Sequence, residues 1–188
     1  MLQIPDFSNK PLEVLTIPDF LSSSDISNIL EGIKNIEYQK ANIETNNHRS
    51  SNIKLIPNTD EWDWLRNKIF SQTQIINSEN YRFEIFPYQL GSLQYTEYNS
   101  SQNDHYNWHL DIGPHTYSHR KISIVIQLSS PEEYEGGILE FNIGNIYNFP
   151  KGKGLASFFP SYILHRVTPV TKGIRKSLVI WFEGPHFK

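Results

Sequence analysis

The sequence predicts a mainly β fold in which helices near the N-terminus buttress a β-sandwich. Before residue 81, apolar residues recur at the spacing of amphipathic helices. From residue 81 onward the pattern changes to short runs rich in β-branched and aromatic residues, separated by Gly, Pro, Asn or Ser clusters. These predicted strands cover residues 81–86, 92–98, 120–128, 137–141, 154–159, 162–168 and 175–182.

The chain of 188 residues is long enough to bury one core, and we expect a single domain over 1–188. Residues 1–80 would form a helical support region, and 81–188 the β core. A short strand ending at Pro18 opens the support region.

Two helices are expected in the support region. The first follows Ser22, whose side chain and that of Asp25 have the spacing of a capping box, and apolar residues recur along 26–33 at helical spacing. The second runs from about residue 60 to residue 76. Asn- and Ser-rich stretches at 42–52 and 99–107 are predicted to be loops.

Composition excludes several classes of site. The chain has no cysteine, so any metal must be held by nitrogen and oxygen ligands, and no disulfide or cysteine nucleophile is available. The formal net charge of -3 disfavours a nucleic-acid partner or an anionic membrane surface. No apolar run approaches the roughly 18 residues that span a bilayer. We expect a cytoplasmic protein without nucleic-acid or membrane partners.

A histidine and an aspartate in "YNWHLDIG" suggest a metal site. On a strand, residues i and i+2 point to the same side, so His109 and Asp111 could share one ion. His165, inside a later strand, could supply a third ligand. Two histidines and one carboxylate with open coordination positions are typical of non-haem Fe(II) oxygenases, whereas zinc usually takes a more closed set of ligands.

Arg175 offers a cation for the same cavity. The segment 169–173 has the composition of a tight turn, so the strands on either side are expected to pair as a hairpin, with Arg175 roughly opposite His165. A metal at one end and a guanidinium at the other suit a short dicarboxylate, because the planar fork of arginine binds a carboxylate through two parallel hydrogen bonds.

The region from about residue 93 to residue 185 resembles the Fe(II)- and 2-oxoglutarate-dependent dioxygenases, in particular their prolyl-4-hydroxylase-like branch. The resemblance rests on "LQYTEY", "YNWHLDIG", "RKISIVIQL", "GGILEF" and "SYILHRVTPVTKGIRKSLVIWFEGP" in this order. It implies a double-stranded β-helix, or jelly roll, with Fe(II), 2-oxoglutarate and O2 at one mouth. It implies His109, Asp111 and His165 as catalytic iron ligands and Arg175 as the partner of the distal carboxylate of 2-oxoglutarate. It leaves a role for L-ascorbic acid open.

Three neighbours are weaker candidates for binding the co-substrate. Tyr98 takes the place where the family often has a tyrosine near co-substrate or substrate, and Gln127 lies near a position that contributes a polar group in some relatives. Ser177 follows Arg175 by two residues and shares its strand face. The loop before His109 departs from the family, because it is rich in Asn and Ser where relatives commonly carry a glycine.

The sequence assigns no definite role to the other polar residues near the expected mouth. His105, His115 and His119 are expected on loops, since Gly and Pro in "GPHTYSH" argue against a helix that would bring the last two together. Arg120 could face substrate or form a salt bridge. Arg166 should point away from the metal by strand alternation.

The implied reaction is hydroxylation of an aliphatic carbon. The substrate favoured by the branch is a prolyl or other residue of a peptide or protein; a free amino acid or small metabolite is the alternative. Trp181 stands where nucleic-acid demethylases of the superfamily have a second arginine, which disfavours nucleic-acid repair. A cupin-like metal enzyme that does not use 2-oxoglutarate also remains open, although it would have no use for Arg175.

Overall fold

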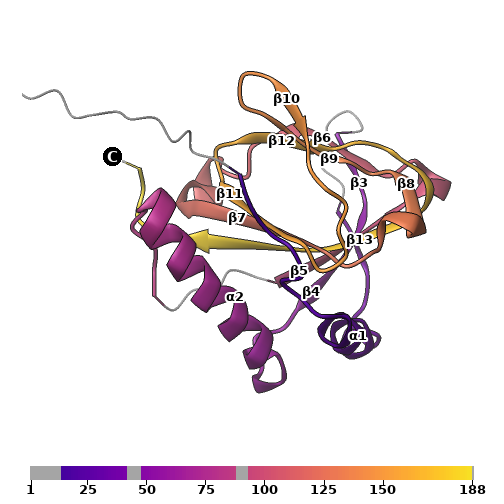
Figure 1. Cartoon of the computed structure of the whole chain (residues 1–188), viewed down its shortest axis with the longest axis horizontal. Helices are drawn as coiled ribbons and strands as arrows, with labels where there is room; N and C mark the ends of the chain where they lie inside the picture. The colour runs from indigo at the N-terminus through magenta and orange to yellow at the C-terminus, as the bar shows by residue number, and fades with distance from the viewer. Residues whose placement is uncertain (1–13, 42–47, 88–92, 188) are drawn as a thin grey trace, which may run out of the picture.

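Two β-sheets face each other, and two helices cover the outer side of the larger one (Figure 1). The structure is a computed structural model that describes residues 14–41, 48–87 and 93–187. The larger sheet has the strand order β1-β11-β7-β13-β5-β4-β2, with β8 also paired to β13, and the smaller has the order β10-β9-β12-β6-β3.

The strands of the larger sheet are β1 (Leu15–Ile17), β2 (Gln39–Lys40), β4 (Asn52–Ile56), β5 (Leu93–Asn99), β7 (Arg120–Gln127), β8 (Tyr134–Gly136), β11 (Ala156–Pro160) and β13 (Val170–Glu183). Those of the smaller sheet are β3 (Arg49–Ser50), β6 (His105–His109), β9 (Leu139–Asn142), β10 (Ile146–Asn148) and β12 (Leu164–Val167). The helices and helical turns are α1 (Ser23–Gly32), α2 (Asp63–Ile76), η1 (Asp60–Trp62), η2 (Asn77–Tyr81), η3 (Ser100–Gln102), η4 (His115–His119) and η5 (Pro131–Glu133).

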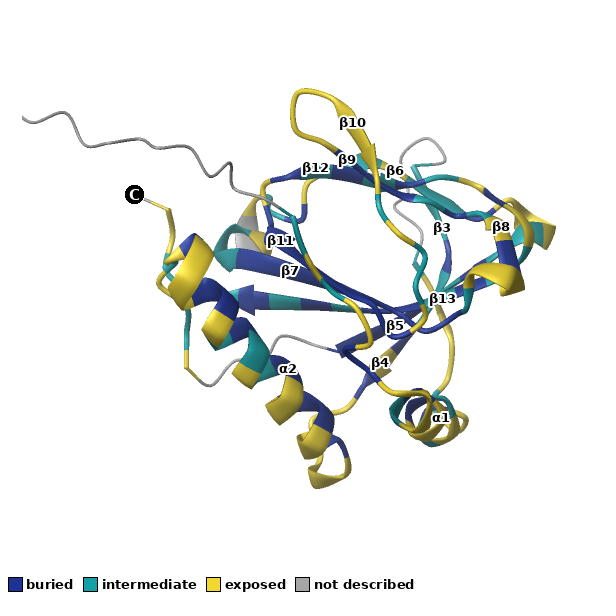
Figure 2. Ribbon diagram, in the orientation of Figure 1, coloured by how far each residue is buried: buried dark blue, intermediate teal, exposed yellow. Residues whose placement is uncertain are grey.

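The two predicted helices form and build the main core. The Ser22 hydroxyl accepts from the Asp25 amide at 3.1 Å, and the Asp25 carboxylate accepts from the Ser22 amide at 3.0 Å, so the capping box that begins α1 is confirmed. In α2, Leu65, Ile69 and Ile76 are buried against the sheet. Figure 2 shows the buried sides of both helices turned toward the larger sheet.

A second apolar cluster lies between the sheets. Phe141 and Phe159 meet there edge to face, with ring centroids 4.7 Å apart, and Val125 and Leu139 belong to the same cluster. The space between the sheets is therefore only partly filled by apolar side chains, and its remaining part holds the polar residues described below. The jelly-roll prediction is confirmed by this pair of facing sheets and by the structural similarity reported below.

The strand predicted over residues 81–86 is wrong. Residues 77–81 form a π-helical turn, and Arg82 adopts a left-handed conformation with φ of 55°. The Asn77 side chain then holds both backbone groups of Phe83, at 2.8 and 2.9 Å, so that these groups do not pair with a neighbouring strand. The alternating aromatic residues of this segment serve ring packing instead, since Phe83 stacks on Tyr81.

The Asn- and Ser-rich stretches contain more strand than expected. β3 and the start of β4 fall within 42–52, although residues 42–47 lie outside the described part of the chain. β6 begins within the second stretch, after the turn η3, and covers its last three residues. Pairing with β5 and β12 orders these polar segments, and this tertiary contribution overrides their weak local preference for strand.

The predicted hairpin between the last two strands is also wrong. β12 pairs with β6 and β9 in the smaller sheet, whereas β13 pairs with β5 and β7 in the larger sheet. The chain crosses between the sheets at residues 168–169 and β13 already begins at Val170. Arg175 is therefore opposite Tyr98 of β5, and it reaches the site from the sheet that faces His165.

None of the helices in the described ranges is both long and apolar enough to cross a membrane.

Candidate active site

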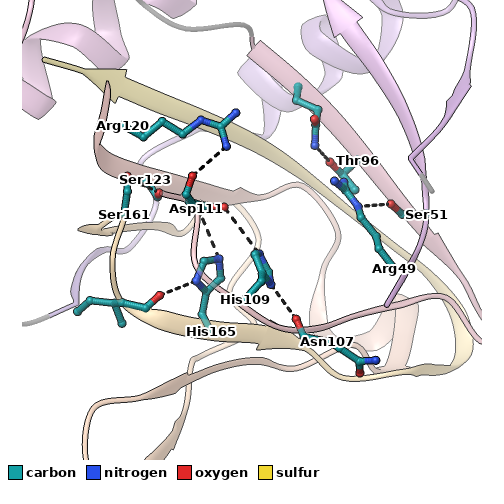
Figure 3. A network of polar contacts seen from close by, with 12 residues as sticks. Arg49, Ser51, Thr96, Asn107, His109, Asp111, Arg120, Ser123, Ser161 and His165 are labelled. Atoms are coloured by element: carbon teal, nitrogen blue, oxygen red, sulfur yellow. Dashed lines mark hydrogen bonds and ion pairs between the residues drawn. The ribbon is translucent and has the colours of Figure 1, made fainter. Parts of the chain in front are cut away.

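Three side chains converge at the end of β6. The ligand atoms of His109, Asp111 and His165 all lie within 4.8 Å of one another. Asp111 stands between the histidines, with one carboxylate oxygen 3.7 Å from His109 Nε2 and the other 3.6 Å from His165 Nε2 (Figure 3). Antiparallel pairing of β6 with β12 places the two histidines directly opposite each other.

Asp111 takes its place by a different route from the one expected. β6 ends at His109, so Asp111 lies beyond the strand and strand alternation does not orient it. Its backbone amide instead donates to the Ser161 carbonyl at 2.9 Å, and the amide of Ile112 donates to the same oxygen at 3.2 Å. Ser161 thus ties the segment after β6 to the turn between β11 and β12.

Each histidine is oriented by a carbonyl two residues before it. Nδ1 of His109 lies 2.8 Å from the Asn107 carbonyl, and Nδ1 of His165 lies 2.8 Å from the Ile163 carbonyl. A carbonyl only accepts hydrogen bonds, so Nδ1 carries the proton in both rings. The lone pair is left on Nε2, which is the nitrogen that faces the shared space.

The surroundings of His109 and Asp111 favour the protonation states in which these side chains can bind a metal. Burial lowers the pKa of His109 to about 3, and the nearby His165 acts in the same direction, so this imidazole is uncharged at neutral pH. Burial alone would raise the pKa of Asp111, but the adjacent imidazoles hold it below its ordinary value. Neutral imidazole and ionised carboxylate are the forms that coordinate metals.

These residues fit a divalent ion. Oδ2 of Asp111 is buried and has no hydrogen-bond partner, which is costly for a carboxylate oxygen unless a cation meets it. An ion about 2 Å from each ligand fits between atoms at the observed separations. The set of two histidines and one carboxylate is the one that non-haem Fe(II) oxygenases use.

Arg175 lies in a narrow inner cavity that the three residues also line. It is only 1% exposed, and its Nε and Nη2 atoms have no hydrogen-bond partner among the described residues. No carboxylate in the described ranges lies within salt-bridge distance of it. A buried guanidinium without a counter-ion is strongly unfavourable, so the cavity is built to receive an anion.

The weaker candidates surround Arg175. Tyr98 lines the same cavity, with its ring centroid 5.4 Å from the guanidinium carbon. Ser177 accepts a hydrogen bond from Arg175 Nη1 at 3.3 Å. Gln127 pairs with Ser177 across the sheet and is buried with an unpartnered side-chain oxygen, but it does not line the cavity.

Tyr134, which the sequence did not single out, also lies beside Arg175. Its buried hydroxyl has no hydrogen-bond partner, and the charge of Arg175 acts on its pKa against the raising effect of burial. Gly137 makes this packing possible. Its φ is +55°, and an added Cβ would come within 3.0 Å of Arg175 Cδ and 3.1 Å of the Tyr134 ring. The absence of a side chain at Gly137 therefore makes room for the guanidinium.

A wider cleft of about 780 Å³ is lined by His109 and Asp111 but not by His165. Its walls include Arg49, Tyr106, Arg120 and Trp181, of which only Arg120 and Trp181 had been considered. Tyr106 stacks on His109 with ring centroids 3.4 Å apart. A register shift between β12 and β6 lies between these two residues, so regular strand alternation could not have predicted the stacking.

The other histidines and Arg166 lie on the following elements and have the following partners. His115 and His119 belong to a 3-10 turn rather than an open loop, and Nδ1 of His119 lies 3.1 Å from the Gly184 carbonyl. His105 is on β6 rather than in a loop. Arg166 points away from the centre, as predicted, and pairs with Glu140 at 2.6 Å.

Comparison with known proteins gives a consistent result. The profile described as the 2OG-Fe(II) oxygenase superfamily matches residues 93–183. A PKHD-type hydroxylase of Rippkaea orientalis is 27% identical over 180 residues, which cover 91% of this chain and 78% of the relative.

Solved structures share the fold. A Pseudomonas putida prolyl-4-hydroxylase superposes with a TM-score of 0.72 at 20% identity, covering 92% of each chain. A Trichoplax adhaerens prolyl hydroxylase, solved in complex with a hypoxia inducible factor oxygen degradation domain peptide fragment, gives 0.75 at 16% identity, covering 92% of this chain and 84% of that one.

Proposed function

The chain belongs to the 2OG-Fe(II) oxygenase superfamily, in its prolyl-4-hydroxylase-like branch, and on that premise we propose that it hydroxylates an aliphatic carbon of a prolyl or other residue in a peptide or protein. Enzymes of this family use Fe(II), 2-oxoglutarate and O2. The observation that carries the proposal is the buried, unpaired guanidinium of Arg175 in the cavity that His109, Asp111 and His165 line.

In this proposal the protein supplies ligands and orientation. His109 and His165 present their Nε2 atoms, each ring oriented by a hydrogen bond at Nδ1, and Asp111 presents an ionised carboxylate. When bound, Fe(II) with 2-oxoglutarate and O2 supplies the oxidising chemistry. Arg175 binds the distal carboxylate of 2-oxoglutarate through its two unpartnered nitrogens.

The residues around Arg175 complete the binding of the co-substrate. Ser177 holds one edge of the guanidinium, which leaves the other nitrogens directed at the ligand. Tyr98 limits the width of the cavity, and Gln127 supports the same corner from β7. The outer cleft leads to the iron ligands from solvent and receives the primary substrate.

The neighbours' peptide substrates support the peptide assignment. One of the similar folds was solved with a peptide bound, and the relatives carry names of prolyl or PKHD-type hydroxylases. A cupin-like enzyme without 2-oxoglutarate is disfavoured, since nothing in such a reaction would require the buried charge of Arg175.

The test is 2-oxoglutarate turnover by protein reconstituted with Fe(II) under anaerobic conditions. On admission of O2 we expect succinate to form, and a +16 Da product to appear among proline-containing peptides offered as substrates. Asp111→Ala is the matched control and should give neither. Failure of the wild-type protein to bind or consume 2-oxoglutarate would contradict the proposal.

A further inference from the structure

Two arginines stand in the wall of the outer cleft. Arg49 comes from β3 at the edge of the smaller sheet, and Arg120 from the start of β7 in the larger sheet. Figure 3 shows them on either side of the group formed by His109, Asp111 and His165. The proposed binding of iron and 2-oxoglutarate has no role for Arg120, which lines the outer cleft and not the cavity of Arg175.

Arg120 is held in position by aromatic rings. Its guanidinium carbon lies 3.8 Å from the ring centroid of Trp181 and 4.5 Å from that of Tyr117. Nη1 donates a weak hydrogen bond to the Asp111 carbonyl at 3.3 Å. Burial lowers its pKa, because the charge is partly removed from water. Stacking of this kind fixes the plane of a guanidinium and leaves nitrogens at its edge available for an anion.

Arg49 is arranged in the same manner. Its guanidinium carbon lies 4.6 Å from the centroid of Tyr106, the ring that stacks on His109. Its Nε donates to the Ser51 hydroxyl at 3.0 Å, and within the described ranges Nη1 and Nη2 donate to no acceptor. Both cleft arginines are thus pre-oriented by one hydrogen bond and by aromatic stacking.

Neither arginine forms a salt bridge within the described ranges, although the charges of Asp111 and Glu183 act on Arg120. Within the described ranges, no carboxylate oxygen lies within 4.0 Å of either guanidinium. Among the described residues that line the cleft, Asp111 is the only carboxylate, and the proposed function assigns it to iron. The two arginines therefore outnumber the acidic groups among these lining residues, although the chain has a formal net charge of -3. A cation that is partly desolvated and unpaired favours an anionic ligand.

We propose that the primary substrate carries a carboxylate, which binds to the stacked guanidinium of Arg120 beside the carbon to be hydroxylated, while Arg49 on the other side of the group adds to the positive charge that attracts it. This inference rests on the proposed function, since it assigns the substrate of the same site. The carboxylate is either the free α-carboxylate of an amino acid or peptide end, or an acidic side chain next to the target residue. A bidentate pair with a stacked arginine would fix the target carbon relative to the iron ligands.

The test measures binding to the anaerobic complex of enzyme, Fe(II) and 2-oxoglutarate by calorimetry. One pair of probes is N-acetyl-L-proline and N-acetyl-L-prolinamide. The other is a blocked peptide with glutamate next to proline and its glutamine counterpart. In at least one pair the carboxylate should bind about tenfold more tightly or better. The pair that responds identifies the source of the carboxylate.

Variants test which arginine causes the preference for the carboxylate probe. Arg120→Gln should reduce it to less than about threefold, and Arg49→Gln should reduce it in part. Arg82→Gln removes an exposed arginine outside the cleft and should leave the preference intact. Equal or undetectable binding of the charged and neutral members of both pairs would overturn the inference, as would a preference that survives in both cleft variants.

The outcomes separate this inference from the proposed function. If wild-type protein binds 2-oxoglutarate but does not prefer carboxylates, only the substrate inference fails. If it does not bind 2-oxoglutarate at all, the proposed function fails first.

Discussion

The two faces of β13 differ in what they bury. Leu178, Ile180 and Phe182 point toward the helices and are 0% exposed within a continuous apolar core. Arg175 and Ser177, on the alternate positions, point between the sheets into the candidate site. One face is filled and apolar, whereas the other holds polar atoms without partners. Alternation along a single strand thus separates the residues that stabilise the fold from those that serve the site.

The inner face has a thermodynamic cost that the outer face offsets. The buried guanidinium of Arg175 and the unpartnered carboxylate oxygen of Asp111 are each unfavourable in a protein without ligands. Ligands that bind only the folded protein therefore stabilise it by mass action. Variants on the two faces should show opposite patterns, with loss of function on one and loss of stability on the other.

The largest effect is expected from removal of a candidate metal ligand in the site between the sheets. Asp111→Ala should abolish iron binding and lower 2-oxoglutarate turnover below about one per cent of wild type, because loss of a metal's outer-shell partners alone costs about 10–100-fold. Metal analysis and succinate release measure the two effects. Glu132→Ala, on the exposed turn η5, is the control and should retain both. Retention of a full complement of iron by Asp111→Ala would exclude this residue as a ligand.

The second largest effect is expected from Arg175→Gln. Loss of the charge should raise the KM for 2-oxoglutarate by about 10³-fold, since removing one partner of a buried charge pair costs about 2–5 kcal/mol. Iron should remain bound. The apoprotein should melt no lower than wild type, because the variant removes an unpaired buried charge. An unchanged KM would mean that Arg175 does not bind the co-substrate, and a strongly destabilised apoprotein would mean that the guanidinium is structural.

Ile180→Ala tests the outer face. Truncation of this fully buried side chain should lower the free energy of unfolding by about 3 kcal/mol through lost burial and a residual cavity. Chemical denaturation measures the loss. At a temperature where the variant is folded, its KM for 2-oxoglutarate should match wild type. A raised KM would show that the two faces of β13 are coupled, contrary to the comparison drawn here.

The smallest effect lies farthest from the strand, at the start of α1. Ser22→Ala removes the hydroxyl that accepts from the Asp25 amide and should cost about 1 kcal/mol of stability. Ser23→Ala, in the first turn of the same helix, should stay within about 0.5 kcal/mol of wild type. Equal losses from both variants would place the effect in helix propensity instead of the cap.

Local patterns predicted much of the fold. Both helices, the capping box and the strands β5, β7, β9, β11, β12 and β13 follow from spacing and residue type, whereas β6, β8 and β10 were not predicted as strands. Partner choice did not follow, because β12 and β13 read as a hairpin across a short connection although they belong to facing sheets. The segment at 81–86 has strand-like alternation, yet the Asn77 side chain takes the hydrogen bonds that a strand would use. Hydrogen bonds and strand partners supplied from outside a segment cannot be predicted from the sequence of that segment.

The residues of the candidate site were also predicted only in part. His109, Asp111, His165 and Arg175 were proposed from motif and resemblance, and the structure brings them to one cavity. Their roles remain predictions. Arg49 and Tyr106 could not have been found, since one lies in an Asn- and Ser-rich stretch and the other beside a register shift. Arg49 is distant from His109 in the sequence, and Tyr106, although only three residues away, would face the opposite side under regular strand alternation.

The tautomer of each imidazole is set by a backbone carbonyl only two residues earlier in the chain, that of Asn107 for His109 and that of Ile163 for His165. A backbone oxygen is present whatever side chain that residue carries. Substitutions in the cleft walls can therefore remodel which molecules are accepted without disturbing the proton that selects the coordinating nitrogen. Separation of this kind makes the scaffold a suitable starting point for laboratory evolution toward new substrates.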